Sequence, residues 1–164
     1  MKKYTAIEQK KKIVGWREYI DLPDWNIKKL KAKIDTGAKS SSIHVEEIEE
    51  ISKTKISFYV ILDKDRGRKK IIAKPIHKGK VKSSIGVKTH RWYVETKVRI
   101  GDIERKIRIN LVGREEMNFR MLIGRTALEN DFLVDASHSY VLKSKNPKRK
   151  QNVLKVKKKR RVLK

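Results

Sequence analysis

The segment KIDTGAKSSSIH, residues 33–44, holds the residues with the clearest capacity for chemistry. Asp35 is followed by Thr36 and Gly37. Gly37 has no Cβ, so the backbone can turn sharply behind the acid, while the Thr36 hydroxyl can hydrogen-bond a backbone group and fix the loop. A carboxyl group held rigidly in this way could serve as a general acid or base. Asp-Thr-Gly is also ordinary turn chemistry, so the tripeptide alone leaves both interpretations open.

The elements around this segment are expected to be β-strands. Leu30, Ala32 and Ile34 alternate with lysines, which predicts a strand that runs directly into Asp35. Further strands are expected at residues 13–20, at 54–62 and from Phe132, and residues 91–112 predict a β-hairpin that turns at Gly101-Asp102. Residues 124–131 predict one or two helical turns and residues 64–70 a turn, while residues 40–51 are compatible with either a loop or a helix.

Many short strands and few helices predict a mainly β fold, either a small barrel or a sandwich. A chain of 164 residues has the size of one domain. Residues 143–164 contain 12 Lys or Arg and no acid. We therefore expect one domain over residues 1–142 and a basic, disordered tail over residues 143–164.

A second motif lies ninety residues beyond the first. MLIGRTAL, residues 121–128, is an apolar run that ends in Gly and leads into the expected helix. Together with KIDTGA it resembles the paired signature of retropepsin-like aspartic proteases, in which the apolar-apolar-Gly element passes beneath the Asp loop. The resemblance implies a small closed β-barrel of the retropepsin type with one short C-terminal helix.

More closely, residues 12–142 resemble the bacterial family known as ATP-dependent zinc proteases, a retropepsin-like group. The matching landmarks are IVGWREYIDLPDW, AKIDTGAKSSSIH, RWYVETKVRIGDIERKIRINLVGREEMNFRMLIGRTAL and FLVDASHSYVL. Members of this family often occur beside ATP-grasp amino-acid ligases, and some are linked to the trimming of glutamate additions. The resemblance thus implies an aspartic endopeptidase with an acidic or glutamate-rich peptide as its substrate.

An aspartic protease needs two adjacent carboxyl groups, one ionised and one protonated, and this chain has one Asp-Thr-Gly. We therefore expect a homodimer in which Asp35 of each copy meets its counterpart at the two-fold axis. The resemblance assigns the catalytic loop to Asp35, Thr36 and Gly37. It assigns structural support of the site to Ile123, Gly124 and Arg125.

The residues expected to contact substrate are Ala38, Lys39, Lys80, Lys82 and Arg91. Retroviral relatives have an acid at the position of Lys39 that pairs with the Arg of the Ile-Gly-Arg element. Arg125 must then find another partner, and Glu46, Glu47 and Asp135 are the candidates. Residues 77–92 are the candidate flap, and their cations favour an acidic substrate, although a solvated loop is the alternative.

Several classes of site have no support in the sequence. The chain has no cysteine, no HExxH motif, and no Gly-rich loop followed by Lys-Ser or Lys-Thr. Its four histidines, His44, His77, His90 and His138, have no recognisable ligand spacing, so we expect surface or hydrogen-bonding roles for them. No metal, ATP or other cofactor is therefore expected, despite the name of the family.

The net charge of +25 indicates polyanionic partners. Thirteen of these charges lie outside the tail, so the body of the protein is basic as well. The alternative function is therefore a non-catalytic basic β-module that binds RNA, the ribosome or another polyanion, and a scaffold for a partner ligase is a third. The tail could contact nucleic acid. No run approaches about 18 apolar residues, and no signal-peptide core follows the basic start, so we expect a cytoplasmic protein with no membrane contact.

Overall fold

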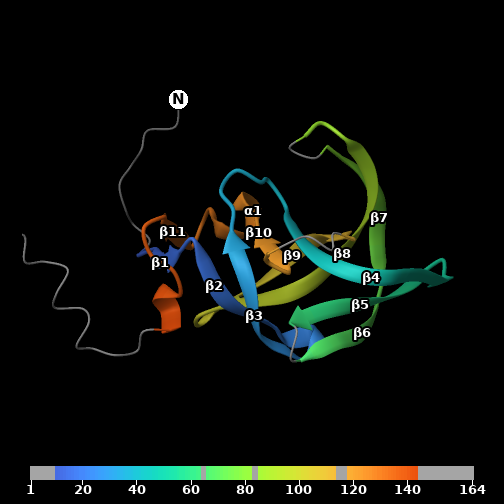
Figure 1. The fold of residues 1–164 in the computed structure, drawn as a ribbon, viewed down its shortest axis with the longest axis horizontal. Coiled ribbons are helices and arrows are strands. Elements are labelled where there is room, and N and C mark those ends of the chain that lie inside the picture. Colours follow the sequence, from blue (N-terminus) through green and yellow to red (C-terminus); the bar gives the residue numbers. More distant parts are fainter. Residues whose placement is uncertain (1–9, 64–65, 83–84, 114–117, 144–164) are drawn as a thin grey trace, which may run out of the picture.

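The computed structural model describes residues 10–63, 66–82, 85–113 and 118–143, and most of these lie in strands (Figure 1). In chain order the elements are β1 (Lys12–Gly15), β2 (Arg17–Leu22), η1 (Pro23–Trp25), β3 (Ile27–Ile34), β4 (Ser41–Ser52), β5 (Lys55–Asp63), β6 (Gly67–Ala73), β7 (Pro75–Lys82), β8 (Lys88–Ile100), β9 (Ile103–Val112), β10 (Met121–Ile123), α1 (Arg125–Leu128), β11 (Phe132–Asp135) and η2 (Val141–Lys143). In this part of the chain no helix is long and apolar enough to span a membrane. The tail, apart from Lys143, lies outside the described residues.

Six strands close into a ring, in the order β10, β3, β2, β8, β9 and β4. The short strand β10 closes the ring because it pairs in parallel with β3 on one side and antiparallel with β4 on the other. Strands β5 and β6 continue the sheet from β4, and β7 pairs with β8 as a projecting hairpin (Figure 1). The expected mainly β, closed architecture is confirmed, and β10 is the element that completes it beside Asp35.

The alternation in β3 determines which of its side chains enter the ring. Leu30, Ala32 and Ile34 are buried, whereas Lys31 and Lys33 are exposed. Burial of a Leu or Ile side chain stabilises the fold by about 1.5–3 kcal/mol, so a shift of one residue in register, which would expose Leu30 and Ile34, would be costly. The register of the strand therefore fixes Asp35 as the first residue beyond its end.

The expected hairpin over residues 91–112 is confirmed. Strand β8 pairs with β9 without interruption from Tyr93↔Asn110 to Ile100↔Ile103. Gly101 adopts φ 64° in the turn, a conformation that residues with a Cβ rarely adopt. The ambiguous segment over residues 40–51 forms the long strand β4, because the ring provides β9 and β10 as its neighbours.

The single strand expected over residues 13–20 is wrong, because the chain divides there at Trp16. Strand β1 pairs in parallel with β11, while β2 pairs antiparallel with β3. A Cβ on Gly15 would lie 2.5 Å from the His138 carbonyl oxygen, and the Trp16 amide donates a hydrogen bond of 2.9 Å to that same oxygen. The loop after β11 therefore turns the chain from one sheet into the other. The short helix expected within residues 124–131 is present as a single turn, Arg125–Leu128.

Asp135, at the end of β11, provides a pH-dependent contact in this loop. Its carboxylate accepts hydrogen bonds from the Ser137 hydroxyl (2.5 Å) and amide (2.9 Å), and it lies 2.6 Å from His138 Nδ1. These contacts, the Ser137 hydroxyl foremost, lower the pKa of Asp135 to about 2. Because the pKa is lower in the folded state, the stabilisation is complete above about pH 4 and is lost as the pH falls toward 2.

We therefore expect Asp135→Asn to lower the urea midpoint of unfolding at neutral pH, and the difference from the native chain to shrink between about pH 4 and pH 2. Urea unfolding curves at closely spaced pH values measure this difference. A difference that stays constant over that interval would show that the contact contributes through packing and not through the charge of the carboxylate.

Candidate active site

Asp35 stands at the point where β3 leaves the ring and the β3–β4 loop begins. Its amide donates a hydrogen bond of 2.9 Å to the carbonyl of Ile123, which continues the pairing of β3 with β10. The side chain is half-buried. Its Oδ1 accepts a hydrogen bond of 3.0 Å from the Gly37 amide, and its Oδ2 accepts none from the residues that the structure describes. One oxygen is thus oriented by the loop, and the other is available to water or to a second carboxyl group.

A tight turn behind the acid sets this orientation. The Ala38 amide donates to the Asp35 carbonyl at 3.3 Å, which closes the turn over Thr36 and Gly37. A Cβ on Gly37 would approach Asp35 Oδ1 to 3.2 Å, so glycine leaves room for the carboxylate. The Thr36 side chain is exposed, and its hydroxyl makes no hydrogen bond within the described part of this single chain. The carbonyl of Thr36, not its hydroxyl, holds the loop.

Gly124 carries the chain closely beneath the loop. A Cβ there would lie 2.5 Å from the backbone carbon of Ser40 and 2.6 Å from its carbonyl oxygen. The Gly124 amide donates to the buried hydroxyl of Ser41 at 3.0 Å. Beyond it, the Arg125 amide donates to the Ala38 carbonyl at 2.9 Å. Backbone contacts of Gly124 and Arg125 therefore hold the Asp35 loop from β10 and the start of α1.

The Arg125 guanidinium completes the support of the loop. Its Nη1 donates hydrogen bonds to the carbonyls of Thr36 (2.8 Å) and Gly37 (3.1 Å). The expected carboxylate partners of Arg125 are therefore wrong: Glu46 and Glu47 pair with Arg68, and Asp135 pairs with His138. Lys39 is exposed, and its carbonyl accepts from the Thr126 hydroxyl at 3.1 Å. Two backbone carbonyl oxygens thus accept the hydrogen bonds that we expected an acidic side chain to accept from Arg125.

We expect Arg125→Ala to loosen the Asp35 loop. Hydrogen bonds from a charged donor contribute about 1.5–3 kcal/mol each to the free energy of unfolding. Because Arg125 is exposed to solvent, we expect the substitution to lower that free energy by about 1.5 kcal/mol in total. A displaced carboxylate should also lower turnover by at least about tenfold. Thermal unfolding and peptide-cleavage assays measure the two effects. Arg108→Ala, which removes an exposed cation on β9, is the matched control, and equal losses in both variants would contradict the role given to Arg125.

Three of the expected substrate-binding cations, Lys80, Lys82 and Arg91, lie on the β7–β8 hairpin, which curls over one side of the molecule (Figure 1). The register Lys80↔His90 and Gly79↔Arg91 places Lys80 and Lys82 on one face of the hairpin and Arg91 on the other. Arg91 donates from Nη1 to Asn110 Oδ1 at 3.0 Å. Neither Lys80 nor Lys82 contacts the Asp35 loop among the described residues, so the three cations do not form one cluster.

A groove of about 340 Å³ lies between the hairpin, β4 and the end of β9. It is lined by Ile48, Ile85, Val87, Trp92, Leu111 and Val112 together with polar residues that include Arg91. Of the side chains expected to contact substrate, Arg91 alone reaches this groove. The described residues contain no group of three or more His, Asp or Glu side chains that could hold a metal ion. Two of the histidines, His44 and His138, make hydrogen-bond or ion-pair contacts, with His44 buried and His138 exposed.

Two residues of the site were not found by sequence reasoning. The carbonyl of Trp16 accepts a hydrogen bond of 2.8 Å from the Ile34 amide, which holds the end of β3 from the opposite side to β10. The Ser41 hydroxyl holds Gly124. The run of three serines indicates that a hydroxyl lies near the Asp35 loop, but the sequence does not show which of the three hydroxyls is buried. Nothing in the spacing of Trp16 pointed to a backbone contact.

A strand that ends in Asp-Thr-Gly, an Ile-Gly strand crossing beneath it and a short helix after that strand define a retropepsin-like protein. The family model described as "RimB-like: Retropepsin-like aspartic endopeptidase RimB" matches residues 13–145. The chain belongs to this family. The retropepsin-like class implied by the sequence is thereby confirmed, whereas nothing in the comparisons supports the zinc and the ATP of the family name that the sequence suggested.

Several curated relatives bear the name of a different enzyme. The proteins named "Probable alpha-L-glutamate ligase" from Shewanella pealeana and Desulfotalea psychrophila are 31% and 34% identical to the chain over 140 and 130 residues. The matches cover 81% and 76% of this chain but only 30% and 28% of those proteins. The chain thus spans less than a third of the length of these relatives, and most of each relative has no counterpart in it.

A solved structure has the same fold. The crystal structure of a protein of unknown function (DUF785) from Legionella pneumophila superposes with a TM-score of 0.66 at 32% sequence identity. The match covers 79% of this chain and 97% of that protein. The ring of strands and the Asp35 loop are therefore placed within a fold that is known from experiment.

Proposed function

We propose that the chain is an aspartic endopeptidase that works as a homodimer, in which Asp35 of each copy forms the water-activating pair. The observation that carries the proposal is the construction of the Asp35 loop. One carboxylate oxygen is oriented by the Gly37 amide, the loop backbone is fixed by Arg125, and the other oxygen is free of partners among the described residues. A turn with no chemical task would not require this support from a strand ninety residues away.

In the proposed reaction the two Asp35 carboxyl groups share one proton, since both cannot ionise at close distance. The ionised group takes a proton from water, which attacks the scissile carbonyl, and the protonated group polarises the carbonyl oxygen. The apparent pKa values of this reaction would belong to the pair and not to either residue. A single chain holds half of the pair, so the proposal requires association.

The proposed substrate is an acidic or glutamate-rich peptide. The net charge of +25 attracts polyanions, and the relatives named as glutamate ligases associate this domain with glutamate chemistry. Cytoplasmic localisation and contact of the basic tail with nucleic acid are parts of the same proposal. It is tested by replacing Asp35 with Asn and measuring the cleavage of acidic peptides.

A second candidate is a binding module without catalysis. The observation that favours it is that the relatives named as ligases contain a segment similar to this chain within less than a third of their length. Such a segment could hold a glutamate-bearing chain for a ligase. The two candidates predict different results for cleavage of acidic peptides. A peptidase cleaves them and loses that activity when Asp35 is replaced, whereas a binding module cleaves none with or without Asp35.

A further inference from the structure

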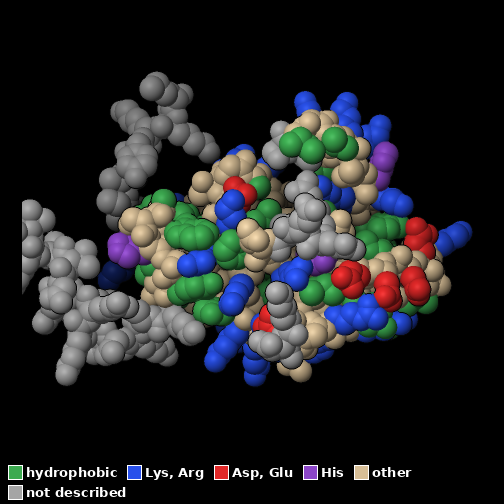
Figure 2. Space-filling view, viewed as in Figure 1, with side chains coloured by type: hydrophobic (Ala, Val, Ile, Leu, Met, Phe, Trp, Pro, Cys, Tyr) green, Lys and Arg blue, Asp and Glu red, His purple; other side chains and the backbone are tan. Residues whose placement is uncertain are grey.

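The outer surface of β2 and β3 carries a group of cations that the proposed reaction does not use. Lys31 and Lys33 project from the exposed face of β3, and Arg17 lies directly opposite Lys33 on β2. Cross-strand partners lie on the same face of a sheet, so the three side chains share one surface. Figure 2 shows Lys and Arg side chains spread over this face, while acidic side chains gather over the outer half of β4.

Arg17 is held in place by aromatic rings. Its guanidinium carbon lies 4.5 Å from the centre of the Trp16 ring and 5.1 Å from that of Tyr140, and Tyr140 stacks on Tyr19 at 4.5 Å. The Arg17 Nε is buried and makes no hydrogen bond within the described part of the chain. The ring contacts therefore hold a half-buried cation that no described acid neutralises.

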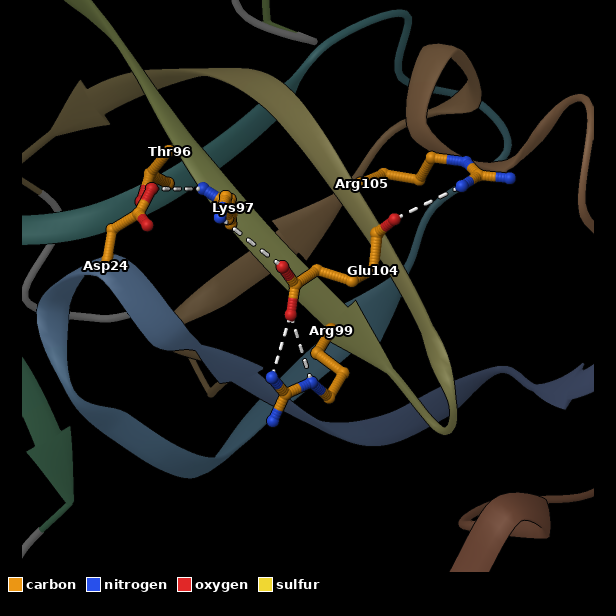
Figure 3. A network of polar contacts seen from close by, with 6 residues as sticks. All are labelled: Asp24, Thr96, Lys97, Arg99, Glu104 and Arg105. Carbon is orange, nitrogen blue, oxygen red and sulfur yellow. Dashed lines mark hydrogen bonds and ion pairs between the residues drawn. The ribbon is translucent and has the colours of Figure 1, made fainter.

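Four cations on the neighbouring strands β8 and β9 are paired with acids. On β8 and β9, Lys97 and Arg99 both contact Glu104, as Figure 3 shows, and Arg105 and Lys106 contact Asp131 and Glu95. No described carboxylate lies within ion-pair distance of Arg17, Lys31 or Lys33. The acid on this face of β2, Asp21, instead contacts the Lys29 amide and Arg99. The group of three is therefore a local excess of positive charge without compensation by an acid.

The position of these cations relates them to the candidate active site. Lys33 lies near the end of β3 and precedes Asp35 by two residues, and the Trp16 carbonyl accepts a hydrogen bond from the Ile34 amide between them. Side chains that alternate along a strand repeat at about 6.6–6.8 Å, which is also the spacing of alternate carboxylates in an extended acidic peptide. A glutamate run lying along β3 could therefore meet Lys31 and Lys33 in register.

We propose that Arg17, Lys31 and Lys33 form an exosite that binds carboxylates of an acidic peptide and leads that peptide to Asp35. The inference rests on the proposed function for the destination of the peptide, but the binding itself does not require cleavage. Arg17 provides the fixed cation, and the two lysines provide adjustable ones. The proposed occupant is an acidic polypeptide because Lys31 and Lys33 have the spacing of alternate carboxylates in an extended chain, and Arg17 adds a cation beside Lys33 on the neighbouring strand.

The test uses the full chain with Asp35→Asn, labelled with ¹⁵N and titrated with hexaglutamate. We expect amide shifts to centre on residues 16–19 and 30–34, and Lys31→Gln combined with Lys33→Gln to weaken binding about fivefold, as for two exposed ion pairs. Lys53→Gln combined with Lys55→Gln removes the same charge in the turn after β4 and at the start of β5, and should weaken binding less than about twofold. Lys31→Arg with Lys33→Arg should retain the affinity.

Three results would overturn the exosite: shifts confined to the basic tail, equal weakening by the two pairs of Gln substitutions, or tighter binding of a single-stranded RNA of equal charge at the same amides. The last would identify a nucleic-acid surface. Cleavage by the chain with native Asp35 is measured separately. Retained binding without any cleavage would refute the peptidase and support the exosite. Cleavage without binding at these residues would support the peptidase and refute the exosite.

Discussion

Replacement of Asp35 by Asn is expected to abolish cleavage of acidic peptides, with a fall in kcat of at least about 10³-fold. An amide cannot accept the proton of the attacking water, and in a homodimer one substitution removes both carboxyl groups. The fold should persist, because the Asn side-chain oxygen can still accept the Gly37 amide that Asp35 Oδ1 now accepts. Peptide cleavage followed by mass spectrometry, circular dichroism and sedimentation measure activity, fold and association.

Asp102→Asn is the matched control. Asp102 lies in the turn between β8 and β9, and the substitution removes an exposed carboxylate whose partner is Lys12 of β1. It should leave turnover unchanged. Cleavage that persists in Asp35→Asn at the native rate would refute the aspartic mechanism. If Asp35→Asn loses both cleavage and the folded state, Asp35→Glu is measured instead. This variant keeps the charge and should keep the fold, but its longer side chain misplaces the carboxylate, so cleavage should still be lost.

Mixing experiments examine the dimer with the same variant. An excess of Asp35→Asn chains added to native chains should lower the activity of the native chains, because mixed dimers hold a single Asp35 carboxyl group. When the two kinds of chain are mixed at a constant total chain concentration, the expected activity falls with the square of the native fraction. Activity that stays proportional to the native fraction would show that one chain suffices and that a second carboxyl group must come from elsewhere.

The sequence predicted the site more successfully where local pattern and local geometry coincide. The alternation of Leu30, Ala32 and Ile34 placed a strand directly before Asp35, and the glycine after Thr36 predicted the turn. The hairpin at Gly101 followed from the same kind of local signal. Each of these features depends on residues that are neighbours in the chain, so its cause can be read from a short segment.

The features that were missed depend on distant segments. The break at Trp16 arises because the His138 carbonyl occupies the space beside Gly15, and those residues are more than a hundred positions apart. The partners of Arg125 were sought among acids, yet the turn presents two backbone carbonyls at the correct distance. The charge of a side chain indicates its need for a partner, but only the folded backbone determines which oxygen supplies it.

Gly124→Ala is expected to be the most destabilising single substitution at the site. The new Cβ would lie 2.5 Å from the backbone carbon of Ser40, so the β3–β4 loop or β10 would have to move. Strain from overpacking costs about 1–3 kcal/mol, and a clash with the backbone of Lys39 and Ser40, which cannot rotate away as a side chain can, favours the upper end, about 3 kcal/mol. Movement of either element also disturbs the Asp35 amide bond to Ile123, so cleavage should fall together with stability.

Gly113→Ala separates this effect from the general cost of replacing glycine. Gly113 follows β9, and among the described residues the atom nearest to a Cβ there is the Val45 carbonyl oxygen at 3.8 Å, an ordinary contact distance. Urea unfolding of the two variants should differ by about 3 kcal/mol, with Gly113→Ala close to the native chain. If the two variants unfold at the same urea concentration, the close approach of Gly124 to the Asp35 loop does not determine the stability of the site. The loop would then be held by Arg125 and the backbone hydrogen bonds alone.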